Sequence, residues 1–505
     1  MQRNLSPGTL DGISTATSAM LKSRAINALL WSAADGFLRQ GLQFTVSIVL
    51  ARMLGPSEFG TIALLAIFTG IGTVLLDGGF SAALIQRQDV DRVDESTVFW
   101  FNLCIGLVVA LALWALGPMI AAFYSQPILV PLMTVMALNV FLSGLGAIHA
   151  TLLAKELNFR TLMKVGTAAN IVSGGVAIWM AYKGFGVWAL AIQAILMTGV
   201  STLLLWSLHR WRPLSAFSRA SVRKLFGFGG YHFASSMMEI IYSRLYTLLI
   251  GRFYNVRELG LYNNADNTKQ MPCGFFTSIL MRVAFPMFSA AADDKATLRR
   301  GVQVAARGMM LLNVPMMLGM AAVAKPLVLT LFGQNWLPMV PVLRVLCLVG
   351  VLWPLQVINL QVLMAQGHSR LMFRLEVIKK SIGLVLLVAG AFHGIMGIAW
   401  SQVLSSTVSF VINAHYSRRM LDYGAIDQTR DFLPILGVAL AMAGIVYQLD
   451  LHLVLRPQVA LVLLTCVGAI VFALLGWLLR LATVDEMIAL YRSRLLVRQQ
   501  TSKDA

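Results

Sequence analysis

Residues 28–52 read ALLWSAADGFLRQGLQFTVSIVLAR, and residues 228–252 read FGGYHFASSMMEIIYSRLYTLLIGR. Each stretch is an apolar run that carries a polar residue at about every third or fourth position, which places the polar side chains on one face of a helix. A duplicated half with such a stripe is typical of transporters, which build a central cavity between two lobes. The two stripes consist of Ser32, Asp35, Arg39, Gln43 and Ser47, and of His232, Ser235, Glu239, Ser243 and Thr247.

The composition places the chain in a membrane. Hydrophobic residues make up 58% of its 505 residues and charged residues only 12%, and the mean hydropathy is +0.75. Such a chain has too little polar surface to cover a water-soluble globule of this size. The first 24 residues lack the apolar core of a secretory signal, so no cleaved targeting peptide is expected. The four cysteines show no paired spacing, and we expect neither a disulfide framework nor a metal site.

Apolar runs of about 20 residues are long enough to cross about 30 Å of hydrocarbon. We predict fourteen such spans, and hence an all-α polytopic membrane protein with both termini on one side. The spans cover residues 25–51, 58–84, 96–117, 128–153, 161–182, 185–208, 226–251, 258–286, 301–323, 339–364, 371–392, 395–417, 432–449 and 457–479.

The basic residues set the orientation, because cytoplasmic loops carry an excess of Lys and Arg. Most of the 40 basic residues fall in loops and tails on the side of the N-terminus, so both termini are predicted to be cytoplasmic. The net charge of +18 then belongs mainly to these loops and does not indicate a nucleic-acid partner. The opposite loops hold only Arg52, Lys183, Arg252, Arg257, Lys325 and Arg456.

A second pair of matching segments divides the chain into lobes. Phe159-Arg160 opens the fifth span, and Phe373-Arg374 opens the eleventh. Each lobe therefore has six spans, and this even number gives parallel repeats related by a pseudo-twofold axis along the membrane normal. The predicted organisation is a cytoplasmic N-tail at 1–24, an N-lobe at 25–216, a C-lobe at 217–417, and two further helices with a cytoplasmic C-tail at 418–505.

The chain resembles a known family, the Wzx-type polysaccharide and lipid-linked oligosaccharide flippases of the multidrug/oligosaccharidyl-lipid/polysaccharide exporter superfamily. The resemblance runs over most of residues 20–420 and is carried by short motifs whose order and spacing match. These motifs are ARMLGPSEFG at 51–60, Asp77-Gly78-Gly79, LGLYNNA at 259–265, Phe285-Pro286 and the two Phe-Arg pairs.

The resemblance implies a function as well as a fold. A polyisoprenyl-pyrophosphate oligosaccharide would cross from the cytoplasmic to the periplasmic leaflet of a bacterial inner membrane by alternating access, for exopolysaccharide, capsule or O-antigen synthesis. It also implies pathway partners such as a polysaccharide polymerase and a chain-length regulator. No catalytic residue and no resident cofactor are expected, and a proton or sodium gradient is the expected energy source.

Basic residues inside the predicted spans agree with an anionic substrate. A basic side chain at the centre of a membrane helix costs about 2.5 to 3.5 kcal/mol on insertion scales, so these residues should face a wet cavity or a partner. Arginine binds phosphate oxygens through two hydrogen bonds, and lysine binds them as a point charge. For Arg39, an ion pair with Asp35 or Glu239 is the alternative. The predicted substrate-binding residues are Arg39, Arg244, Lys269, Arg307, Lys379 and Lys380.

Acidic residues inside the spans suggest ion coupling. Asp35 and Glu239 are the candidates for carrying a proton or binding Na⁺. Asp77 precedes two glycines and is expected to shape the end of its helix. Asp266 is expected to cap its helix or to pair with Lys269, three residues later.

Rival functions make different demands on the sequence. A multidrug exporter of the same superfamily binds cationic amphiphiles and should have an acidic cavity, whereas basic residues are in excess in these spans. An enzyme acting on lipid-linked sugars would need an extended periplasmic loop, and the predicted loops are too short. A lipid II flippase remains an alternative, because its substrate is also a pyrophosphate lipid.

Overall fold

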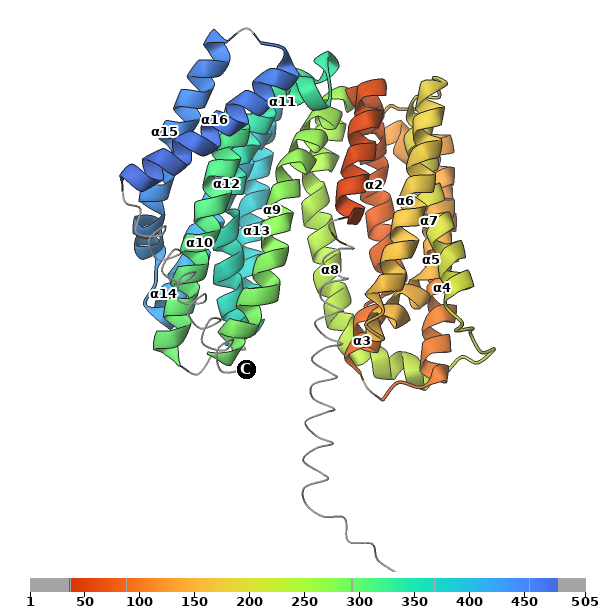
Figure 1. Ribbon diagram of the computed structural model, residues 1–505. Coiled ribbons are helices and arrows are strands. Elements are labelled where there is room, and N and C mark those ends of the chain that lie inside the picture. The colour runs from red at the N-terminus through yellow and green to blue at the C-terminus, as the bar shows by residue number, and fades with distance from the viewer. Residues whose placement is uncertain are drawn as a thin grey trace, which may run out of the picture. The chain divides into compact units, whose positions relative to one another are not determined.

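The computed structural model describes residue 36 and residues 38–87, 89–291, 294–366, 369–453 and 455–479. Within these ranges the chain forms helices joined by short connections, and none of the described residues lies in a β-strand (Figure 1). The prediction of an all-α protein is confirmed. Asp35, the predicted N-tail and the residues after 479 lie outside the described residues.

Packing divides the chain into two compact units, Met1–Arg252 and Phe253–Ala505. Among the described residues of the first unit, a helix covers residues 38–53. Its other helices are α2 (Pro56–Asp77), α3 (Phe80–Gln86), α4 (Arg92–Phe123), α5 (Leu129–Lys155), α6 (Phe159–Tyr182), α7 (Val187–Leu208) and α8 (Arg219–Phe253), which ends at the boundary.

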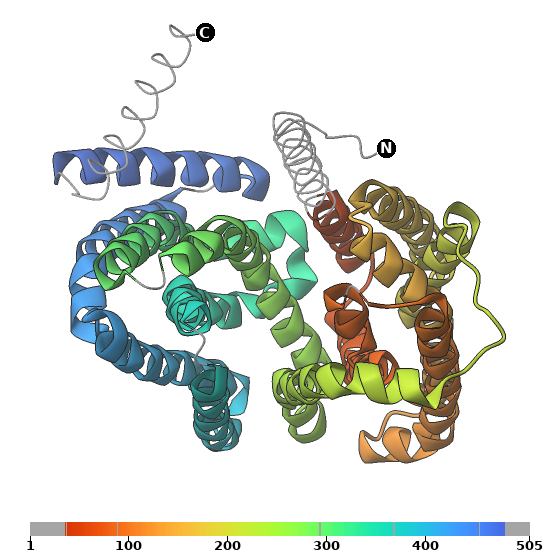
Figure 2. The ribbon, with the colours of Figure 1, turned by 90° about the horizontal axis from the view of Figure 1, so that it is seen from below.

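The second unit contains eight long or medium helices and one short 3₁₀ turn among its described residues. The helices are α9 (Val256–Ala290), α10 (Lys295–Ala322), α11 (Ala324–Leu331), α12 (Met339–Ala365), α13 (Ser369–Ala391), α14 (Gly394–Leu421), α15 (Ala425–His452) and α16 (Pro457–Leu478), and the 3₁₀ turn is η1 (Gln334–Trp336). Figure 2 looks down the helices of each unit and shows α16 at the edge of its own unit, where it packs mainly on α15 and α11.

The predicted spans from the third to the fourteenth each overlap one long helix, whereas the second, 58–84, is divided between α2 and α3, and the described part of the first falls in the helix over 38–53. Ten of the described helices are long and apolar enough to cross a membrane, which makes the chain a multi-pass membrane protein. The helices α8, α9 and α13 are not among these ten, and all three carry several charged residues. The count of fourteen crossings therefore stays a prediction.

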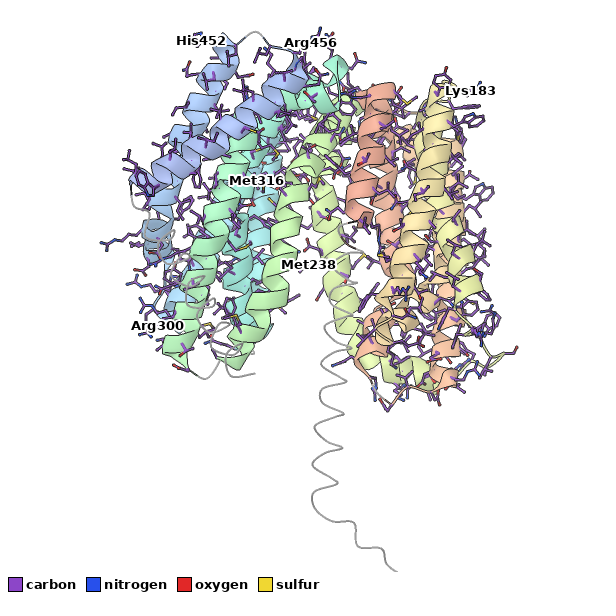
Figure 3. All side chains as sticks on the ribbon, in the orientation of Figure 1. Lys183, Met238, Arg300, Met316, His452 and Arg456 are labelled. Atoms are coloured by element: carbon purple, nitrogen blue, oxygen red, sulfur yellow. The ribbon has the colours of Figure 1, made fainter. Side chains whose placement is uncertain are left out.

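Loops of the second unit that are predicted to lie on opposite sides of the membrane are found at opposite ends of this unit. Figure 3 shows Arg300 near one end of α10 and Met316 further along the same helix. His452 and Arg456 lie at the opposite end of this unit. Arg300 belongs to a predicted cytoplasmic loop and Arg456 to a predicted periplasmic loop, so the two predicted sides are separated as a membrane protein requires. Which side is cytoplasmic stays a prediction.

Two glycines separate α2 from α3. Gly78 and Gly79 have φ angles of +55° and +79°, in the left-handed region that favours glycine. The carboxylate of Asp77 accepts a hydrogen bond of 3.1 Å from the Gly79 amide, which confirms that Asp77 shapes this helix end. A Cβ atom on Gly79 would lie 2.0 Å from the carbonyl oxygen of Gly229 in α8. Only a glycine allows the two backbones to approach so closely.

The linker before α8 is fixed to the first unit. The backbone amide of Leu214 donates to Ser96 at 2.9 Å, and the amide of Ser218 donates to Thr97 at 3.1 Å. Both hydroxyls belong to the first two turns of α4, so the two hydrogen bonds attach the linker to the start of this helix. Packing consequently groups α8 with the first unit. The predicted lobe boundary at 216/217 follows the sequence repeat, which is a different criterion, and stays a prediction.

A proline inside α12 is accommodated by a neighbouring helix. Pro354 has no amide hydrogen, so the carbonyl of Gly350, four residues earlier, cannot receive its usual helical hydrogen bond. The side-chain amide of Asn313, fully buried on α10, donates to this carbonyl at 2.9 Å. The contact keeps the buried carbonyl satisfied and fixes α10 against α12.

Candidate functional site

The guanidinium of Arg39 lies against the backbone of α6. A Cβ atom on Gly166, a buried residue of α6, would be 3.2 Å from Nε and 3.4 Å from Cζ of Arg39. The Arg39 side chain is half-buried. The sequence places Arg39 on the polar stripe of its helix, and the structure adds that a glycine on another helix makes room for its charged group.

Arg244 occupies a similar position on α8. Its Nε is 4.0 Å from where a Cβ on Gly70 of α2 would stand, and that Cβ would lie closer to Ile240, 3.1 Å from its Cδ1. Arg39 and Arg244 therefore both belong to the first unit, and each lies beside a glycine of a different helix. Glu239 is also on α8, and its side chain is exposed.

The second unit holds two buried lysines, each with an acidic partner on its own helix. Lys269 is 6% exposed, and its Nζ is 2.5 Å from the carboxylate of Asp266. Lys379 is 9% exposed and forms an ion pair with Glu376. The expected pairing of Asp266 with Lys269 is confirmed. In both cases a separation of three residues brings opposite charges onto one helix face.

Arg307 is held by a residue far away in the sequence. Its guanidinium is 2.9 Å from the carboxylate of Asp431 on α15, and the hydroxyl of Tyr423 donates to the same carboxylate at 2.9 Å. The three side chains fasten α10 to α15, so the structure gives Arg307 a role in packing. A substrate contact by Arg307 stays a prediction.

The remaining predicted site residues divide between the units. Lys380 is half-buried on α13 of the second unit, next to the more deeply buried Lys379. Asp35 lies outside the described residues, and its pairing with Arg39, like a pairing of Arg39 with Glu239, stays a prediction. Arg39, Arg244 and Glu239 thus belong to the first unit, and the other described candidates belong to the second.

A charged network at the base of α8 did not figure among the predicted residues. Lys224 contacts Asp94 at 3.1 Å and Asp89 at 3.3 Å, and Arg87 contacts Asp89 at 2.9 Å. Hydrogen bonds from Arg87 and from Lys224 hold the pKa of Asp89 well below its usual range. We call this set of four residues, together with the linker 209–218, the clasp. Only the local pair Arg87 and Asp89 has a sequence signal, because the other contacts join distant segments.

Comparison with known proteins agrees with this architecture. The family model described as polysaccharide biosynthesis protein matches residues 49–341. The lipopolysaccharide biosynthesis protein WzxC of Escherichia coli is 28% identical over 403 residues, which are 78% of this chain and 81% of that protein. The succinoglycan biosynthesis transport protein ExoT of Rhizobium meliloti is 25% identical over 473 residues, 92% of this chain and 95% of that protein.

A solved structure shares the fold. The lipid II flippase MurJ, in an inward closed conformation, superposes with a TM-score of 0.71 at 15% identity, covering 89% of this chain and 98% of that one. At this identity the likeness concerns the fold alone. The family model, in contrast, covers more than half of the chain, from the first helix into α12. The chain therefore belongs to the polysaccharide biosynthesis protein family.

Proposed function

We propose that this chain is a flippase that moves a polyisoprenyl-pyrophosphate-linked oligosaccharide from the cytoplasmic to the periplasmic leaflet of a bacterial inner membrane by alternating access. The product would serve exopolysaccharide, capsule or O-antigen synthesis. Family membership, the transport named for ExoT and the fold shared with a flippase support the proposal. The observation that carries it is the presence of basic side chains, Lys269 and Lys379 among them buried, within the long helices of a membrane protein.

The proposed binding residues suit a pyrophosphate. Charge-assisted hydrogen bonds from guanidinium groups to phosphate are about twice as strong as neutral ones, and a forked donor matches the geometry of two oxygens. Arg39 and Arg244 supply two such donors from the first unit. We assign them the leading role in binding the anionic head group.

The basic residues of the second unit have graded roles in this proposal. Lys269 and Lys379 each form an ion pair with a carboxylate on the same helix. The negative partner offsets the charge of the lysine, so its attraction for a distant anion is reduced. Lys380 is less buried than Lys379 and adds long-range attraction. Arg307, which is bound to Asp431, contributes least.

Coupling to an ion gradient is proposed for Asp35 and Glu239. The exposed carboxylate of Glu239 lies five residues before Arg244 on α8, so that loading of a proton or Na⁺ would alter the field at the arginine. No resident cofactor or metal is invoked. In Glu239→Gln, transport should lose its dependence on an imposed gradient while the melting temperature stays unchanged. Gradient dependence equal to that of the unmodified protein would reject the role of Glu239.

The setting of the protein follows from the same proposal. We place both termini in the cytoplasm, and we expect membrane lipids to surround the chain. The protein acts as a transporter and leaves covalent chemistry to other members of the pathway. A polysaccharide polymerase and a chain-length regulator are the proposed partners.

Flipping by the purified protein tests the proposal. The protein is reconstituted in liposomes with undecaprenyl pyrophosphate carrying a fluorescent oligosaccharide, and movement is read as loss of fluorescence to an impermeant quencher. Protein-dependent movement of this glycolipid, with no movement of a cationic dye, is the expected result. Dye movement alone would assign the chain to multidrug export. Preference for lipid II in a competition assay would favour the cell-wall alternative.

A further inference from the structure

The helix over residues 38–53 packs along α6, and two glycines of α6 lie at the contact. Arg39 lies against Gly166. Seven residues later Val46 meets Gly174, where a Cβ atom would be only 2.7 Å from the Cγ2 of the valine. The contacts advance by seven residues on one helix and by eight on the other, so the two helices run side by side in the same direction.

These two contacts differ in how easily the neighbouring side chain can move away from an added Cβ atom. Val46 is short, branched and 7% exposed, in a cluster with Leu50, Ala177 and Leu190, so nothing at Gly174 can move aside easily. The atoms of Arg39 that meet Gly166 are at the end of a long, flexible side chain. An added methyl group at Gly166 would therefore displace a charge by a few tenths of an ångström without separating the helices.

We propose that Gly166 is a positioning residue for the pyrophosphate of the substrate, acting through Arg39. The absence of a side chain on Gly166 lets the guanidinium lie close to the backbone of α6, which limits its rotamers and fixes the direction of its donors. A forked donor binds two oxygens only in a narrow range of orientations, and small displacements at such a site are costly. This inference rests on the proposed role of Arg39 in substrate binding.

The helix itself offers a matched control. Gly175 is also on α6, and a Cβ atom there would meet no atom within 4 Å. Any effect of replacing a helical glycine in general should appear equally at both positions. The series Gly166→Ala and Gly166→Val is therefore compared with Gly175→Ala and Gly175→Val in the full-length protein.

The readout separates affinity from turnover. Initial flipping rates are measured in liposomes against the mole fraction of fluorescent undecaprenyl pyrophosphate oligosaccharide, and its Kd is measured in detergent. We expect KM and Kd to rise about threefold in Gly166→Ala and about tenfold in Gly166→Val, as a charge-assisted hydrogen bond is weakened. The kcat should change little, and both Gly175 variants should behave as the unmodified protein does. Unchanged KM and Kd in Gly166→Val would overturn the proposal.

A double variant tests whether Gly166 acts through Arg39. If it does, Gly166→Val combined with Arg39→Ala should bind the glycolipid as weakly as Arg39→Ala alone. Two losses that simply multiply would overturn the proposal, as would an Arg39→Ala protein with normal Kd. Failure of the unmodified protein to flip the glycolipid would instead overturn the proposed function, and the Kd series would still report on Gly166. A melting temperature of Gly166→Val below that of Gly175→Val, with unchanged Kd, would identify a packing role.

Discussion

The two units hold their buried basic groups in different ways. In the second unit, Lys269 and Lys379 each have a carboxylate three residues earlier on the same helix. In the first unit, Arg39 and Arg244 lie beside glycines of neighbouring helices. The first arrangement balances a charge locally and tolerates movement of the helix. The second fixes the position of a charge relative to another helix, which is what recognition of a shaped anion requires.

Removing the carboxylate partner of a buried lysine in the second unit should have the largest effect, a loss of stability. In Asp266→Leu, the buried ammonium of Lys269 loses its balancing charge, and we expect a loss of about 3 kcal/mol in stability. Thermal unfolding in detergent measures it. The double variant Asp266→Leu with Lys269→Met should recover most of the loss, because an apolar pair replaces a buried ion pair at little cost. An unchanged melting temperature in the single variant would show that the pair does not balance Lys269.

Adding a side chain at Gly174 should have the second largest effect, a loss of stability. The methyl group of Gly174→Ala meets Val46 at a distance that requires movement, and overpacking typically costs about 1–3 kcal/mol. Replacing glycine by alanine in a helix returns about 0.5–1 kcal/mol, so a net loss of about 1–2 kcal/mol is expected by thermal unfolding. Gly166→Ala should show no such loss. Equal losses of stability in Gly174→Ala and Gly166→Ala would show that both glycines serve packing.

Changing the shape of the charge in the first unit should affect transport and not stability. In Arg39→Lys the charge remains, but the forked donor is lost, and we expect KM for the glycolipid to rise about tenfold, equivalent to about 1.4 kcal/mol. The melting temperature should stay constant. Lys295→Arg is the control, because Lys295 lies outside the proposed binding residues and an arginine can still pair with Asp422, so its KM should be normal. A normal KM in Arg39→Lys would mean that charge alone suffices.

The smallest effect is expected at an exposed ion pair. Lys295 and Asp422 are 2.6 Å apart but mostly exposed, and such pairs contribute little. The hydrogen bond from Lys295 lowers the pKa of Asp422, so any contribution is present above the ordinary carboxyl pKa and is lost as the pH falls below it. Asp422→Asn should leave the melting temperature at pH 7 unchanged. A decrease larger than that of Asp266→Leu would show that this exposed pair contributes more to stability than the buried one.

The sequence was sufficient to predict the structural features that depend on residues close together in the chain. Apolar runs located the long helices of the described chain, because burial in a membrane requires length and hydrophobicity, but they did not reveal the short helices α3 and α11. The pair Asp266 and Lys269 and the helix end at Asp77 were also predictable, since each is local. Contacts between helices were not. The pairing of Arg307 with Asp431 and the position of Arg39 on Gly166 depend on how each helix is rotated about its axis and how far it is shifted along its neighbour, and no short pattern specifies either quantity.

The clasp at the base of α8 bears on the order of events during synthesis. Every group in it, from Arg87 to Lys224, lies in the N-terminal half of the chain. Ribosomes release this half first, and chains tend to fold in the order in which they emerge. The linker can therefore close onto α4 while the second unit is still being translated. The clasp would then hold the start of α8 to α4 in the first unit before the second unit is complete.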